Sequence, residues 1–140
     1  MEAKLVTWML QGPAWLRFAF KKQILGQDPD PTPAVSCQDI RALVQVLRSP
    51  DRGFPALAQG RVSYTILRVL DVLSRYPRAA GRPEFQEMLG SVRHKAEDGR
   101  YKVESMAKMF KGFDFGQRKE PSRWITFLVQ RIEKRVAANG

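Results

Sequence analysis

The sequence has 140 residues and a formal net charge of +10, because 24 lysines and arginines outnumber 14 aspartates and glutamates. This length is typical of one domain, and a composition of 44% apolar and 27% charged residues is too hydrophobic for a disordered chain. The single Cys37 excludes an internal disulfide, and with the single His94 it excludes a closed zinc site of Cys and His ligands. We expect a basic, single-domain protein of the reducing cytoplasm, without a metal or cofactor.

The longest apolar stretch, residues 5–20, is interrupted at positions 11–13 and at Arg17. It falls short of the roughly 20 apolar residues that a membrane-spanning helix needs. No basic start followed by an apolar run and a small-residue cleavage site is recognisable. We therefore expect no membrane span and no signal peptide.

Residues 2–11 predict a short helix that Gly12 and Pro13 end. Pro13 suits the first turn of a second helix, which we expect to run to about Leu25 and to stop at Gly26. Residues 27–35 contain three alternating prolines, which favour an extended Pro-rich linker.

Ser36 and Asp39 have the spacing of a capping box and predict the start of a third helix. Its apolar residues, with a period close to 3.6, are Ile40, Leu43, Val44 and Leu47. The next helix is expected between Gly60 and Tyr76, with one buried stripe composed of Val62, Ile66, Val69, Leu70 and Leu73.

After an expected turn at residues 78–81, Pro83 suits the first turn of a further helix that carries Phe85, Met88, Leu89 and Val92. Asp98-Gly99 marks a turn, residues 103–110 predict a short helix, and residues 112–120 an irregular segment.

Pro121-Ser122 predicts the start of a last helix that runs to about Val136. Its apolar side consists of Trp124, Ile125, Leu128, Val129, Ile132 and Val136. Arg123, Gln130, Arg131 and Lys134 fall on the other side. The chain as a whole predicts an all-α domain, an antiparallel array of six or seven helices arranged as hairpins.

The C-terminal third carries an ordered set of unusual residues: DGRY at 98–101, ES at 104–105 and GFDFGQRKEPSRWIT at 112–126. The N-terminal part adds GPAW at 12–15 and ILG at 24–26. These stretches resemble bacterial proteins related to squalene cyclases and protein prenyltransferases. The resemblance covers less than half of the chain.

This resemblance implies α-hairpins stacked as part of an α/α toroid, either as an arc, as a truncated relative or as an assembly in which several chains complete a cavity. Gly99 and Tyr101 match the family's repeat, but Lys95 stands where the repeat has Gln. The acidic motif of the cyclases is missing from the sequence, and Cys37 and His94 do not reproduce the zinc ligands of the prenyltransferases. The resemblance therefore predicts a fold and carries over no catalytic residue.

Several aromatic residues lie where the resemblance would suggest an apolar pocket. A non-catalytic binding module would use Trp15, Phe113, Phe115 and Trp124 to hold an apolar ligand, a protein partner or a second copy of the chain. Aromatic residues at helical spacing are also typical of an ordinary core, and both interpretations stay open here.

The basic C-terminal stretch favours an alternative, a nucleic-acid-binding protein. Residues 117–135 hold six positive and two negative residues, a local surplus of +4. The candidate contacts are Arg118, Lys119, Arg123, Arg131 and Lys134, with Phe127 expected on the polar side of the last helix as a stacking platform or interface contact. The same arginines would also suit a solvated helix surface or the C-terminal end of the helix dipole.

An enzyme is the third hypothesis, with Asp114 as an acid. Two flanking phenylalanines would raise the pKa of Asp114 if they bury it, but an Asp in a Gly-rich turn usually caps a backbone N–H. His94 is a candidate base or a capping residue, and Cys37 lies beside no evident catalytic partner.

Overall fold

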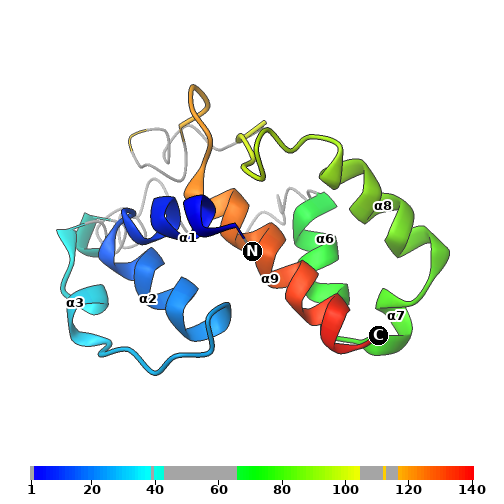
Figure 1. Cartoon of the computed structure of the whole chain (residues 1–140), viewed down its shortest axis with the longest axis horizontal. Coiled ribbons are helices and arrows are strands. Elements are labelled where there is room, and N and C mark those ends of the chain that lie inside the picture. The colour runs from blue at the N-terminus through cyan, green and yellow to red at the C-terminus, as the bar shows by residue number, and fades with distance from the viewer. Residues whose placement is uncertain (1, 39, 43–65, 105–111, 113–116) are drawn as a thin grey trace, which may run out of the picture.

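The computed structural model describes residues 2–38, 40–42, 66–104, 112 and 117–140. Within those ranges the secondary structure is helical, with an isolated β-bridge between Glu97 and Arg100 and no sheet (Figure 1). The all-α prediction is confirmed, while the toroid-like arrangement stays a prediction.

The chain begins with two packed helices, α1 (Ala3–Leu10) and α2 (Ala14–Gln23). They bury Leu5, Met9, Leu16 and Phe20, which recur at helical spacing. Gly12 and Pro13 separate the helices as predicted, although Pro13 precedes the first turn of α2 rather than lying in it. Gly26 has a φ of +68°, which glycine adopts without strain.

The Pro-rich segment is not extended throughout. Thr32–Val35 forms the short helix α3, which packs against α2 and buries Ala34. The Asp30 carboxylate accepts a hydrogen bond from the Thr32 backbone N–H at 3.0 Å, and Pro33 fits the first turn, where no intrahelical donor is needed. The prediction of a linker over residues 27–35 is therefore wrong for its second half.

The prediction that Ser36 starts a capping box is also wrong. The Ser36 hydroxyl donates to the Thr32 carbonyl oxygen at 2.7 Å, so this side chain ends α3 instead of starting the next helix. Residues 38 and 40–42 are helical, as expected for the segment around Ile40. The predicted core residues Leu43, Val44, Leu47 and Val62 lie outside the described residues.

Helix α6 (Ile66–Leu73) belongs to the segment where one buried stripe is predicted. Leu70 is fully buried and Leu73 partly so, but Ile66 is 46% exposed, which corrects the prediction at that position. The expected turn after it contains a short helix, α7 (Pro77–Ala80), since Pro77 suits a first helical position. Helix α8 (Pro83–Arg93) follows as predicted and buries Phe85, Leu89 and Val92.

Asp98 and Gly99 form the predicted turn, with φ angles of +52° and +72°. Glu97 and Arg100 exchange both backbone hydrogen bonds across it, which makes a two-residue hairpin. The next residue anchors this hairpin, because the Tyr101 N–H donates to the buried Thr126 hydroxyl at 3.1 Å and the Tyr101 carbonyl accepts from the Ser122 N–H at 2.7 Å. Burial raises the pKa of Tyr101 above its ordinary value.

The last helix, α9 (Arg123–Ala138), lies between α1 and α2 on one side and α6 and α8 on the other (Figure 1). The Ser122 hydroxyl accepts from the Ile125 N–H and caps its start. Val129 and Ile132 enter the core shared with α6 and α8. Phe127 enters the core shared with α1 and α2, which we name the aromatic core because Trp8, Trp15 and Trp124 surround it.

Candidate binding groove

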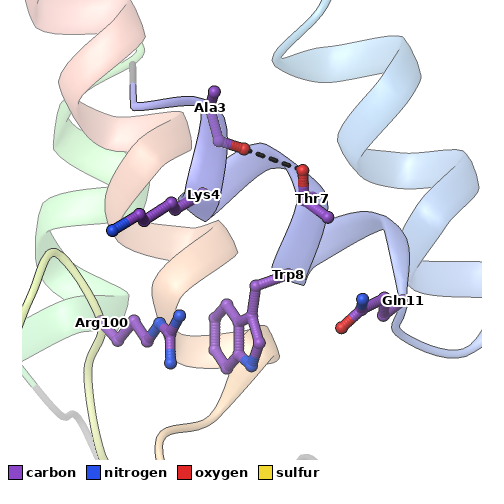
Figure 2. A pocket seen from close by; sticks show the side chains of 6 residues that line it. All are labelled: Ala3, Lys4, Thr7, Trp8, Gln11 and Arg100. Carbon is purple, nitrogen blue, oxygen red and sulfur yellow. Dashed lines mark hydrogen bonds between the residues drawn. The ribbon is translucent and has the colours of Figure 1, made fainter.

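A shallow groove of about 410 Å³ lies along one face of α1. Its lining consists of Ala3, Lys4, Thr7, Trp8 and Gln11 from the helix or its end, together with Arg100 from the hairpin (Figure 2). Positions 4, 8 and 11 share a face because they recur every three or four residues. The Asp98-Gly99 turn brings Arg100 to this face.

Trp8 is the centre of the groove. The guanidinium carbon of Arg100 lies 4.7 Å from the centroid of the Trp8 ring, and that of Arg123 lies 4.8 Å from it. Both distances are within the range of cation–π attraction. Figure 2 shows the Arg100 guanidinium beside the indole, with the Lys4 side chain projecting from α1 above them.

Arg123 is fixed in place by the backbone. Its Nε donates to the Trp8 carbonyl oxygen at 2.9 Å, so the first residue of α9 binds a backbone carbonyl in the last turn of α1. A Cβ on Gly12 would come within 2.8 Å of the Arg123 Cδ and 3.1 Å of the Met9 carbonyl oxygen. Position 12 therefore requires a residue without a side chain for Arg123 to pass.

The groove is positively charged. None of its lining residues is acidic, and within the described ranges no ion pair involves Lys4 or Arg100. The Glu97 carboxylate, across the hairpin from Arg100, pairs with Lys102 at 2.9 Å. Two cations without a carboxylate beside an apolar ring favour an anionic ligand.

Most residues of the predicted nucleic-acid face on α9 form hydrogen bonds within the protein. Arg131 donates two hydrogen bonds of 2.9 Å to the Asp71 carboxylate and one to Gln23. Lys134 donates to the backbone carbonyls of Gln23 and Ile24, where α2 ends. These cations link α9 to α6 and α2. Of the predicted set, Arg118, Lys119 and Lys134 are exposed, and Lys134 is bonded to the two carbonyls of α2 and its end.

Phe127 is not on the surface, and the sequence-based placement of this residue is wrong. Its side chain is 1% exposed and stacks on Trp124 with ring centroids 5.7 Å apart. The single apolar side assumed for the last helix does not apply, because α9 is covered from two directions. Arg131 lies over the Phe127 ring at 5.2 Å and shields its edge of the core.

The residues predicted for an apolar ligand are partly brought together. Trp15 and Trp124 are in contact, with centroids 5.5 Å apart, and both pack against the aromatic core. Their partners Phe113 and Phe115 lie outside the described residues, as does the candidate acid Asp114.

The surroundings of His94 and Cys37, the two remaining candidates for catalysis, do not indicate a catalytic site in the described part of the chain. His94 is exposed, and its Nδ1 lies 2.7 Å from the Gly90 carbonyl oxygen at the end of α8. Cys37 is partly exposed next to the end of α3. In the part of the chain that the structure describes, no three His, Cys, Asp or Glu side chains gather as a metal site would require.

Sequence reasoning missed the groove because its two halves are far apart in the chain. The spacing of Lys4, Trp8 and Gln11 on a predicted helix was a usable signal, and Asp98-Gly99 signalled a tight turn before Arg100. Nothing in the sequence pairs position 8 with position 100.

No family model, curated protein or solved structure matches this chain. The resemblance to squalene cyclases and prenyltransferases thus stays a prediction made from the sequence. Among the described residues, none of the helices has both the length and the apolar composition for crossing a membrane.

Proposed function

We propose that this chain is a non-catalytic helical binding module whose binding surface is the groove of Lys4, Trp8 and Arg100. The observation that carries the proposal is a pair of cations that have no carboxylate partner among the described residues and lie beside an indole that lines an open groove. Elsewhere the cations of α9 are held by Asp71 or by backbone carbonyls, so they have less charge to offer a ligand.

The ligand class is anionic. Lys4 is exposed, so its ammonium group is accessible to an anionic ligand. Arg100 lies against Trp8, and this contact limits the rotamer entropy that its guanidinium loses when it binds an anion. The net charge of +10 adds long-range attraction for any anionic partner.

An apolar ligand between Trp15 and Trp124 receives less support. These two rings already contact each other, and Trp124 also stacks on the buried Phe127. Their contacts suit the wall of a core, so we assign the binding role to the groove that Trp8 lines.

The test is a fluorescence-anisotropy titration of the full chain against two labelled polyanions, a polyglutamate peptide and a single-stranded oligothymidylate. We expect at least one of them to bind with an affinity that falls as salt rises, and R100Q to weaken that binding. Arg78 on α7 is an exposed arginine outside the groove, and R78Q removes the same charge as a control. Equal losses in R100Q and R78Q, or no binding of either polyanion at low salt, would contradict the proposal.

A further inference from the structure

The groove offers flat surfaces as well as charge. The guanidinium carbon of Arg100 lies 4.7 Å from the centroid of the Trp8 ring, so the groove places a planar cation over an aromatic ring. Bases of single-stranded nucleic acids stack on aromatic rings and on guanidinium planes, whereas a carboxylate needs only the positive charge. The arrangement therefore fits a ligand that has both anionic groups and flat rings.

Gln11 distinguishes the same two ligand classes. Its exposed side-chain amide lines the groove next to Trp8 and has both donor and acceptor groups (Figure 2). Carboxylates and phosphates only accept hydrogen bonds, so they leave the amide oxygen unused. The edge of a base has donors and acceptors and can use both.

On these grounds, and resting on the proposed function, we infer that the groove binds single-stranded nucleic acid, with Lys4 and Arg100 on its phosphates and a base beside Trp8 and Gln11. A volume of about 410 Å³ on one helix face is large enough for an unstacked base. In a duplex the bases are stacked and paired, and their flat faces do not reach such a surface.

Further exposed cations lie in the segment before α9. Arg118 and Lys119 are exposed and precede the start of α9, where Arg123 reaches Trp8. The Ser122 N–H bonded to the Tyr101 carbonyl joins this segment to the hairpin that carries Arg100. Arg118 and Lys119 lie five and four residues before Arg123 in the chain, and they are candidates for sequence-independent contacts to a nucleic-acid backbone.

The experiment is an anisotropy titration of the full chain with a labelled single-stranded oligothymidylate of about twelve nucleotides, within the usual range of single-strand site sizes. The same oligonucleotide as a duplex and a polyglutamate peptide are the competing probes. We expect the single strand to bind more tightly than either of them, and R100Q to raise its Kd about tenfold, as expected for loss of a stacked, charged contact. K4Q should lower the slope of log K against log salt by about 0.7, the value for one phosphate contact on a single strand.

Two further variants separate stacking from charge. R100K keeps the charge but loses the plane, so we expect it to weaken binding about threefold, whereas R78Q outside the groove should stay within about twofold of the parent. Circular dichroism of each variant checks the fold, and K4Q removes an exposed side chain, so it tests the groove even if R100Q is unstable.

The outcomes distinguish this inference from the proposed function. If polyglutamate binds and R100Q weakens it while the oligonucleotide does not bind, the inference is overturned and the anion-binding module stands. If the duplex binds as tightly as the single strand, or R100K binds as the parent does, base stacking is overturned. If neither probe binds at low salt, both proposals fail.

Discussion

Positively charged residues have different partners on the two sides of α9. On the side of α6 and α8, cations meet carboxylates: Arg93 pairs with Glu133 at 2.6 Å, and Asp71 holds Arg131 and Arg135 at 2.9 Å. Hydrogen bonds to Glu133 raise the pKa of Arg93, as expected for a guanidinium held by its counter-ion. On the side of α1, aromatic rings replace the carboxylates, and both Arg100 and Arg123 lie on Trp8.

This difference indicates which of the positive residues behind the net charge of +10 are available to a ligand. A cation that faces a carboxylate is neutralised and serves packing, whereas a cation on an aromatic ring keeps most of its field for a ligand. The number of positive residues on a segment is thus a poor guide. Residues 117–135 hold six positive residues, yet Arg131, Lys134 and Arg135 are engaged in hydrogen bonds within the protein.

The largest expected effect is at the residue of α9 that belongs to the aromatic core. We expect F127A to lower the free energy of unfolding by about 3–5 kcal/mol, because a fully buried phenylalanine leaves a cavity. Urea denaturation followed by circular dichroism measures it, with V72A as the control, since Val72 is 47% exposed. A loss for F127A as small as that for V72A would show that Phe127 lies on the surface after all.

The next effect is at the Asp71 carboxylate, which lies 2.9 Å from both Arg131 and Arg135 and 4.0 Å from Arg75. D71N should cost about 3 kcal/mol, toward the low end of the range for broken buried pairs, because Arg131 and Arg135 then lack a counter-ion while Asp71 is only 16% exposed. The same denaturation experiment on D28N, at an exposed position, should show no more than about 0.5 kcal/mol. Equal losses in the two variants would mean that the Asp71 network contributes no stability.

A pair of glycines contrasts the two sides of α9 directly. G12A should destabilise the protein by about 2 kcal/mol, since the new Cβ meets the Arg123 side chain that is bonded to Trp8. G90A should stabilise it by about 0.5–1 kcal/mol, because Gly90 lies inside α8 and a Cβ there meets no other atom within 4 Å. Thermal unfolding of both variants gives the signs, and a shift of the same sign in both would break the contrast.

The smallest effect concerns an exposed pair at the start of α8. The Arg82 guanidinium, hydrogen-bonded to Glu84, lowers the pKa of that carboxyl below its ordinary value of 4.5. Since the pKa is lower in the folded than in the unfolded state, the pair stabilises the fold above pH 4.5 and loses this contribution as the pH falls through the folded value. The difference in unfolding free energy between E84Q and the parent should therefore shrink in acid, and a growing difference would contradict the pairing.

Much of the fold could be predicted because helical periodicity is local information. The stripe of Phe85, Leu89 and Val92, the turn at Asp98 and the cap at Ser122 are each specified by residues within one or two turns. The errors at α3 and α7 have one cause, since a proline that breaks one helix can begin the next.

The candidate site was harder to predict, because it depends on contacts between distant segments. The burial of Phe127 follows from α1 and α2 covering a second side of α9, which a helical wheel of one segment does not contain. The positions of Arg123 and Arg100 against Trp8 likewise follow from the docking of the hairpin and of α9 onto α1.

The central claim is that, among the described residues, the groove at Trp8 is the surface that binds an anionic ligand. The most direct test is a heteronuclear NMR titration of the three indole N–H signals, those of Trp8, Trp15 and Trp124, with the single-stranded oligothymidylate. We expect the Trp8 signal to move most, with Trp15 and Trp124 nearly unchanged, and the shift to be lost in R100Q. The largest shift at Trp15 or Trp124, or equal shifts at all three, would contradict it.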